Sequence, residues 1–386
     1  MENALNTFRD TQGLLKPLNS PRPFFESRHI LELDGLRGIA IILVLIHHIG
    51  QSFPAFDSTG KADRFLRAWL IVTRPGWLGV DIFFVLSGFL ITGILLDSRG
   101  GSHFYRNFYM KRILRIFPVY YLTLLVMLVF YHWPWRFFAV SLIYLSNVSV
   151  LFGVPLVMGP LWSLSVEEHF YLVLPWVIQF VHARTLFRVA IVICLAEPFI
   201  RLYAFHTGSF NPYFTWFRLD GLACGAMVAI LIRNHSLAQV KGWAAGFCSL
   251  SAIVFFVSVP FGGASRLNPI GTMLVYFCTS LFTAGTVACL AMMPSIPLFT
   301  VLRSAPLRFM GDISFCVYLI HMFVILGFYR LTDTVFNRPY VGGVFHSASS
   351  AYWLHFAAVF VVCSVIGVLS RNYFEGPIRA YRAHFE

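Results

Sequence analysis

The segment 33–48, LDGLRGIAIILVLIHH, holds two ionisable side chains inside an apolar run. Arg37 and His48 are eleven positions apart, about three α-helical turns and ~16 Å along the axis. Eleven steps of about 100° return to nearly the same direction, so both side chains share one helix face, and Asp34 can pair with Arg37. Each such group costs roughly 2.5–3.5 kcal/mol to insert. We therefore expect functional roles, although a topology-setting Arg and a hydrogen-bonded core His are the alternative.

A second cluster lies in the segment 160–175, PLWSLSVEEHFYLVLP, where Glu167 and Glu168 stand side by side about two turns into an apolar span. They project about 100° apart, so at least one should face the bundle interior. By helical rise, Glu167 comes close to the depth of His48. We expect Glu167 to orient or charge a His48 general base. Interhelical salt bridges, such as one from Glu168 to Arg218, are the alternative.

The segment GDISFCVYLIH, 311–321, puts Ser314, Tyr318 and His321 along one helix face, because they follow an i, i+4, i+7 spacing. This face is expected to line an acceptor cleft or to form interhelical hydrogen bonds. The residues that we predict to contact substrate are Trp162, Ser163, Glu168 and His321.

Arg112 and Arg115, in KRILRIFPVYY, are three residues apart and share a face. Two guanidinium groups suit a phosphate or pyrophosphate, although basic residues also flank ordinary helix ends. Three other charges, Asp81, Arg218 and Asp220, are predicted to be structural. The glycines of 77–92 should allow close helix packing.

The composition predicts a polytopic membrane protein, because 58% of the 386 residues are hydrophobic and only 12% are charged. The net charge of +12 is scattered between apolar runs, which argues against nucleic-acid binding and for a topology signal. The seven cysteines lack metal-type or disulfide spacing, so we expect packing roles and no metal.

We expect an all-α bundle of about ten transmembrane helices with both termini cytoplasmic. The basic loop 98–115 sets this orientation, and it holds only if 136–152 is re-entrant or interfacial. A cytoplasmic segment 1–30, a membrane domain 31–371 and a cytoplasmic tail 372–386 then follow. The ten expected spans are 36–53, 77–97, 116–133, 160–181, 187–205, 214–232, 241–261, 269–293, 308–330 and 351–370.

Seven motifs in order resemble the acyltransferase-3 family, integral membrane enzymes that O-acylate sugars of polysaccharides, lipooligosaccharides and some macrolides. The resemblance covers about residues 31–382, nearly the whole chain. The motifs are LDGLRGIAIILVLIHH, GWLGVDIFFVLSGFLIT, KRILRIFPVYY, GPLWSLSVEEHFYLVLPW, FRLDGLACGA, GDISFCVYLIH and FEGP.

The resemblance implies that Arg37 and His48 are essential and that Arg112 and Arg115 help to use a cytoplasmic acyl-CoA, usually acetyl-CoA. It also assigns importance to Glu375, which our topology puts at the cytoplasmic rim. Many relatives carry an additional span and an extracytoplasmic SGNH domain. We expect a stand-alone form, acting directly or through a separate extracytoplasmic acyl-accepting protein.

The sequence therefore predicts a cell-membrane O-acyltransferase with a carbohydrate, lipid-linked glycan or glycosylated small-molecule acceptor. In this hypothesis the buried His48 is a general base or briefly carries the acyl group. A proton-coupled transporter or flippase of a glycolipid or small solute is the alternative, because buried ionisable groups also serve transport. A purely structural membrane partner would leave the polar cluster unexplained.

Overall fold

The computed structural model describes residues 29–52, 64–131, 134–258, 268–292, 297–335 and 348–381. Within these ranges the chain is helical and contains no β-strand. Most of the expected N-terminal segment 1–30 (residues 1–28), the last residues of the expected tail 372–386 (residues 382–386) and the loop 53–63 lie outside the described residues.

The helices follow one another with short connections. The α-helices are α2 (Leu31–Ser52), α4 (Arg64–Thr73), α5 (Gly79–Ser98), α6 (Phe104–Tyr131), α7 (Trp135–Leu142), α8 (Gly159–Phe180), α9 (Ala183–His206), α10 (Leu219–Asn234), α11 (Leu237–Ser258), α12 (Pro269–Met292), α13 (Ala305–Val335), α14 (Ala348–Leu369) and α15 (Gly376–Tyr381). The remaining turns are the 3₁₀ segments η2 (Arg74–Leu78), η3 (Ser146–Phe152), η4 (Thr215–Phe217) and η6 (Pro297–Arg303), and the π-helical η7 (Ser370–Glu375).

Seven helical stretches in the described chain are long and apolar enough to cross a membrane, so this is a multi-pass integral membrane protein. Each of the ten segments expected from the sequence overlaps one helix of 16 residues or more, although α6 begins at Phe104, well before the expected span 116–133. Three of these helices, α8, α9 and α10, are outside the seven, and α10 has only 16 residues.

The segment 136–152 does not form a continuous long helix. It comprises α7, which has eight residues and rises ~12 Å, and η3, which has seven. Neither piece is long enough to cross ~30 Å of hydrocarbon, as the sequence-based topology required.

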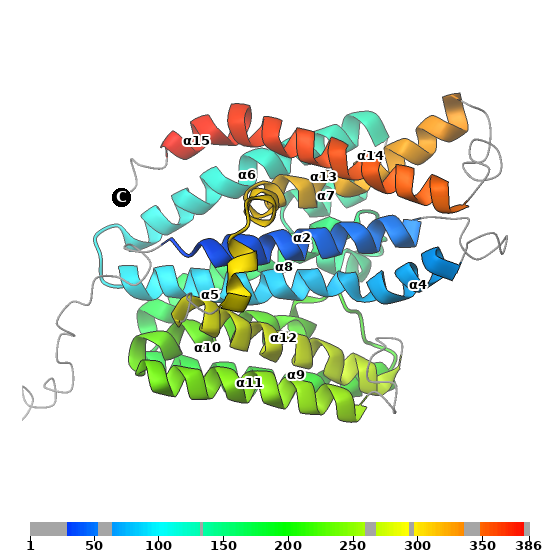
Figure 1. The fold of residues 1–386 in the computed structure, drawn as a ribbon. Coiled ribbons are helices and arrows are strands. Elements are labelled where there is room, and N and C mark those ends of the chain that lie inside the picture. Colours follow the sequence, from blue (N-terminus) through cyan, green and yellow to red (C-terminus); the bar gives the residue numbers. More distant parts are fainter. Residues whose placement is uncertain are drawn as a thin grey trace, which may run out of the picture.

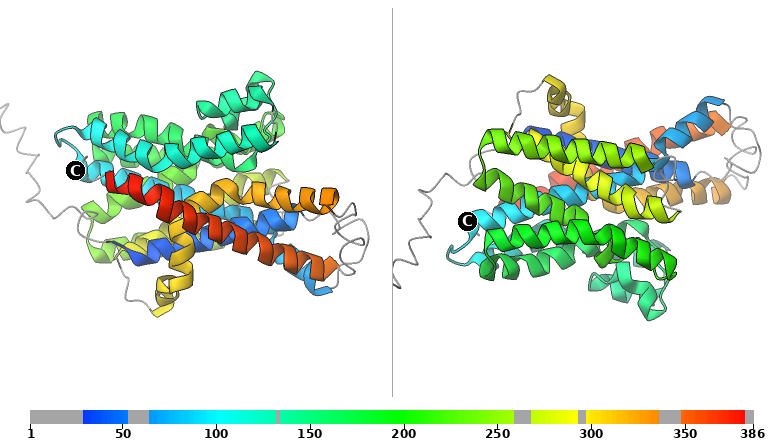
Figure 2. Two further views of the ribbon diagram at one scale, coloured as in Figure 1. Left: turned by 90° about the horizontal axis from the view of Figure 1, so that it is seen from above. Right: turned by 90° about the horizontal axis from the view of Figure 1, so that it is seen from below.

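The long helices run roughly side by side (Figures 1 and 2). In Figure 1, α2 and α5 pass through the middle of the bundle, with α9 to α12 on one side and α6, α13 and α14 on the other. The start of α2 and the short α15 lie at the same end of the bundle (Figure 1). The first and last described helices therefore begin and end on one side.

Glycines bring the central helices into close contact. A Cβ at Gly311 of α13 would overlap the carbonyl oxygen of Asp34 on α2, and one at Gly38 would overlap that of Leu307. Gly88 of α5 likewise leaves no room for a Cβ against α10. The prediction that glycines in 77–92 allow close packing is confirmed.

Ion pairs tie the buried charges of α5, α9 and α10 together. Arg218 donates to Asp81 at 2.8 Å, and both side chains are almost fully buried. Arg201 donates to Glu197 and to Asp220, each at 2.8 Å. The structural roles predicted for Asp81, Arg218 and Asp220 are consistent with these pairs. The proposed Glu168–Arg218 bridge is wrong, because Asp81 is the carboxylate that pairs with Arg218.

The packing of α2 on α13 leads to a stability prediction. Gly311→Ala should lower the free energy of unfolding by about 1–3 kcal/mol, because backbone atoms must move to admit the methyl group. The measurement is thermal unfolding in detergent. Gly246→Ala on α11, where nothing lies within 4 Å of the added carbon, is the matched control and should be neutral or slightly stabilising. Equal effects of the two changes would contradict this account of the interface.

Candidate active site

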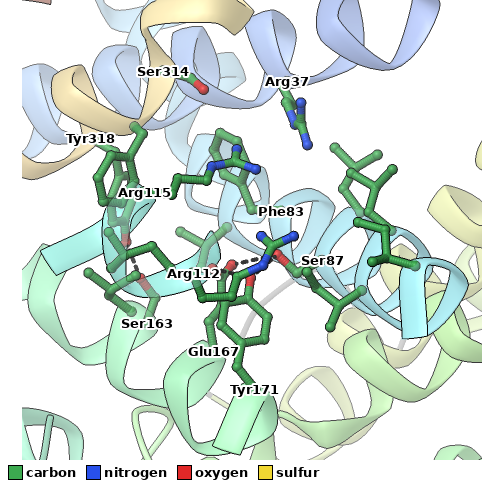
Figure 3. A pocket seen from close by; sticks show the side chains of 18 residues that line it. Arg37, Phe83, Ser87, Arg112, Arg115, Ser163, Glu167, Tyr171, Ser314 and Tyr318 are labelled. Carbon is green, nitrogen blue, oxygen red and sulfur yellow. Dashed lines mark hydrogen bonds between the residues drawn. The ribbon is translucent and has the colours of Figure 1, made fainter. Parts of the chain in front are cut away.

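A cavity of about 220 Å³ lies among α2, α5, α6, α8 and α13, and we call it the basic cavity (Figure 3). Its polar lining combines three arginines with a carboxylate and five hydroxyl groups. These residues are Arg37, Arg112, Arg115, Glu167, Ser87, Ser163, Ser314, Tyr171 and Tyr318, with Phe315 and aliphatic residues of α5 among the remainder.

The three arginines come from two helices. Arg112 and Arg115 of α6 share the face that their spacing predicts, and both line the cavity together with Arg37 of α2. Arg37 donates to Asp34 at 3.3 Å, the i, i+3 pair expected from the sequence. The guanidinium of Arg112 lies 5.7 Å from the centroid of the Tyr171 ring. This concentration of guanidinium groups provides a site for an anion.

Glu167 belongs to the basic cavity. One carboxylate oxygen accepts a hydrogen bond from Ser87 at 3.0 Å, and the other accepts one from Tyr171 at 3.1 Å. Tyr171 also contacts the Ser87 hydroxyl at 3.0 Å, which closes a three-residue network (Figure 3). The expectation that Glu167 orients His48 is therefore corrected: this carboxylate is held by Ser87 and Tyr171, and another residue contacts the His48 ring.

A second cavity of about 80 Å³ adjoins the first, and we call it the histidine cavity. His48 of α2 lines it together with several aromatic rings. Its lining residues are His47, His48, Gln51, Trp77, Val80, Gly159, Pro160, Trp162, Pro212, Tyr213, Arg218, Tyr276 and Tyr318. Most of them belong to the ends of helices opposite the Arg37 end of α2, so the two cavities follow one another along the bundle.

The His48 ring contacts its own helix and α13. Its Nδ1 lies 3.0 Å from the Val44 carbonyl oxygen and 3.2 Å from Nε2 of His321. Nδ1 of His321 lies 2.7 Å from the Tyr318 carbonyl oxygen. His321 is fully buried and lines neither cavity. The expectation that His321 contacts substrate is corrected, because it lies behind His48.

Val80 and Tyr318 line both cavities and form the wall between them. The Tyr318 hydroxyl is 2.5 Å from Ser163 Oγ (Figure 3). Trp162 and Ser163 are neighbours on α8, yet Trp162 lines the histidine cavity and Ser163 lines the basic cavity. Substrate contacts of Trp162 and Ser163 remain predictions. They would take place in different cavities, the histidine cavity for Trp162 and the basic cavity for Ser163.

Two other predicted residues lie outside both cavities. Glu168 lines neither, and its Oε1 is buried without a hydrogen-bond partner. Glu375 accepts a hydrogen bond from Ser370 at 3.0 Å within η7. The substrate contact expected of Glu168 therefore finds no support in the geometry of these two cavities.

Sequence reasoning gave no partner role to Ser87 and did not single out Tyr171. Tyr171 follows Glu167 by four residues, so helix periodicity could have found it. The contact of Ser87 with Glu167 joins α5 to α8 and has no local sequence signal. In the described part of the chain, no three His, Cys, Asp or Glu residues are grouped so as to hold a metal ion.

The described residues thus form a multi-pass membrane protein whose helices enclose adjoining basic and histidine-lined cavities. The chain belongs to the acyltransferase-3 family, whose model, described as an acyltransferase domain, matches residues 30–371. The resemblance inferred from the seven motifs is thereby confirmed.

Curated relatives are similar over most of this chain. YrhL of Bacillus subtilis (strain 168) is 28% identical over 91% of this chain and 55% of its own length. The peptidoglycan O-acetyltransferase OatA of Listeria monocytogenes is 28% identical over 92% of this chain and 56% of its own. The O-acetyltransferase OatA of Staphylococcus aureus (strain NCTC 8325) is 26% identical over 78% and 51%. The chain thus spans about half the length of these relatives. No solved structure matches it.

Proposed function

We propose that this protein is a membrane O-acyltransferase that moves an acyl group, in the first instance acetyl, from cytoplasmic acyl-CoA to a hydroxyl of a carbohydrate or glycosylated acceptor. The observation that carries the proposal is the pair of adjoining cavities, one lined by three arginines and the other by His48. Family membership and the O-acetyltransferase activity named for the OatA relatives support acetyl transfer to a polysaccharide.

The proposed orientation has ten spans and both termini in the cytoplasm. It is supported by the common end of α2 and α15 in Figure 1 and by the basic connection between α5 and α6. In this orientation Arg37, near the start of α2, and Arg112, in the first half of α6, lie toward the cytoplasmic side of the membrane. Acyl-CoA is found on that side.

The donor would bind in the basic cavity with its phosphates against Arg37, Arg112 and Arg115. The ~16 Å between Arg37 and His48 is a distance that the pantetheine arm can cover. To reach His48, the thioester must come past the wall of Val80 and Tyr318. The proposal therefore requires the Tyr318 side chain to move when the donor is bound.

The acceptor would enter the histidine cavity, where Trp77, Trp162 and Tyr213 offer ring faces for a sugar. His48 takes the proton from the acceptor hydroxyl while its oxygen attacks the thioester carbonyl. The carbon–sulfur bond then breaks, and the CoA thiolate leaves and is protonated. The alternative in which His48 carries the acyl group briefly uses the same nitrogen.

His48→Ala should reduce acetyl transfer by at least about 100-fold, because the general base is lost. The assay incubates purified protein with radiolabelled acetyl-CoA and soluble peptidoglycan fragments, and it measures label on the glycan. His206→Ala, a change at an exposed histidine of α9, should retain transfer. Undiminished transfer by the His48 variant would refute the base assignment. Flux of glycan across vesicles without label would instead favour the transporter alternative.

Arg112→Ala and Arg115→Ala should each raise the KM for acetyl-CoA about 10-fold or more, with a smaller change in kcat. The physical reason is the loss of a charge-assisted contact to donor phosphate. Arg188→Ala, at an exposed arginine of α9, is the matched loss of charge. A kcat defect with unchanged KM in the α6 variants would contradict a donor-binding role.

A further inference from the structure

His321 and His48 form an interhelical histidine pair between α13 and α2. The two ring centroids are 4.9 Å apart, and Nε2 of His321 lies 3.2 Å from Nδ1 of His48. His321 has no exposed surface, while His48 lines the histidine cavity. The pair therefore has one member facing the cavity and one member behind it.

The backbone around the pair determines where its protons are. The Tyr318 carbonyl oxygen, 2.7 Å from Nδ1 of His321, can only accept a hydrogen bond. Nδ1 of His321 must therefore carry hydrogen. A neutral imidazole has one N–H, so Nε2 of His321 carries a lone pair and acts as an acceptor.

The same argument then applies to His48. Its Nδ1 faces two acceptors, Nε2 of His321 at 3.2 Å and the Val44 carbonyl oxygen at 3.0 Å. Nδ1 of His48 must be the protonated nitrogen, because neither neighbour can donate to it. The lone pair of His48 is consequently on Nε2, the nitrogen that a general base would use.

We propose that His321 is a positioning residue that holds His48 in the tautomer and ring orientation needed for catalysis. This inference rests on the proposed function of His48 as the general base. When Nε2 of His48 takes a proton from the acceptor hydroxyl, the ring becomes an imidazolium with Nδ1–H still directed at His321. The Tyr318 carbonyl, His321 and His48 then form a chain that stabilises this charge, and no proton needs to move along it.

The Val44 carbonyl cannot do this alone. It lies one turn back on the same helix, where it also accepts the regular backbone hydrogen bond of α2. His321 adds an acceptor from a second helix, so the orientation of the His48 ring is fixed across the α2–α13 interface. The sequence predicts that Glu167 orients His48. In the structure His321 contacts the His48 ring, and Glu167 bonds to Ser87 instead.

Three substitutions separate this role from packing. His321→Gln keeps a carbonyl oxygen that can reach the position of Nε2, whereas His321→Asn is too short and His321→Phe offers no acceptor. We expect the Asn and Phe variants to lose about 10²–10⁴-fold in kcat, with the KM for acetyl-CoA unchanged. The Gln variant should stay within about 10-fold of the parent protein.

The assay uses the full chain in detergent with radiolabelled acetyl-CoA and soluble peptidoglycan fragments, and thermal unfolding is measured for every variant. His355→Gln, a change at a buried histidine of α14 outside both cavities, is the matched control and should keep activity. The inference is overturned if the Asn and Phe variants keep the parent kcat. It is also overturned if folded Gln, Asn and Phe variants lose activity equally.

The two proposals fail in distinguishable ways. Loss of transfer in His48→Ala with full transfer in His321→Phe would remove the positioning role and leave the proposed function intact. Full transfer in His48→Ala would overturn the base assignment and the positioning role together. Selective rescue by His321→Gln among variants of equal thermal stability supports the role proposed here.

Discussion

Helices α2 and α13 approach each other so closely that glycine is required on both sides of their contact. Gly38 lies against the backbone of Leu307, and Gly311 lies against that of Asp34. The part of the site that α2 and α13 build depends on this approach. Arg37 and His48 are fixed on α2, while α13 supplies Tyr318 to both cavities and His321 behind His48. A separation larger by the width of a side chain would break the contact between the two histidines.

Charge distinguishes the two cavities. The basic cavity collects three guanidinium groups around the carboxylate of Glu167, so it retains an excess of positive charge for an anionic molecule. In the histidine cavity the charge of Arg218 is balanced by Asp81 at 2.8 Å, and aromatic rings make up much of the wall. An uncharged sugar suits the second environment and a phosphate-bearing cofactor suits the first. The protein thus separates its proposed substrates by electrostatics as well as by position.

Local periodicity accounts for what could be predicted from the sequence. The apolar runs identified the long helices, and the three-residue spacing of Arg112 and Arg115 predicted that they share a face. Pairings between distant helices were less accessible. Depth counting put Glu167 near His48, but depth says nothing about direction around a helix axis or about the gap between two helices. The partner of His48 comes from α13, 273 positions away in the sequence. No spacing rule relates residues so far apart in the sequence. The structure was therefore needed to identify His321, and not Glu167, as the residue that contacts His48.

The wall formed by Val80 and Tyr318 affects how well the membrane retains ions, because it separates the two cavities of the bundle. A water-filled passage running the length of a transmembrane bundle would dissipate the proton gradient, however slowly the enzyme turned over. Here the Tyr318 ring, whose hydroxyl is hydrogen-bonded to Ser163, lies between the basic cavity and the histidine cavity. In the proposed acyl transfer, this ring keeps the two cavities from joining into one water-filled channel while no donor is bound.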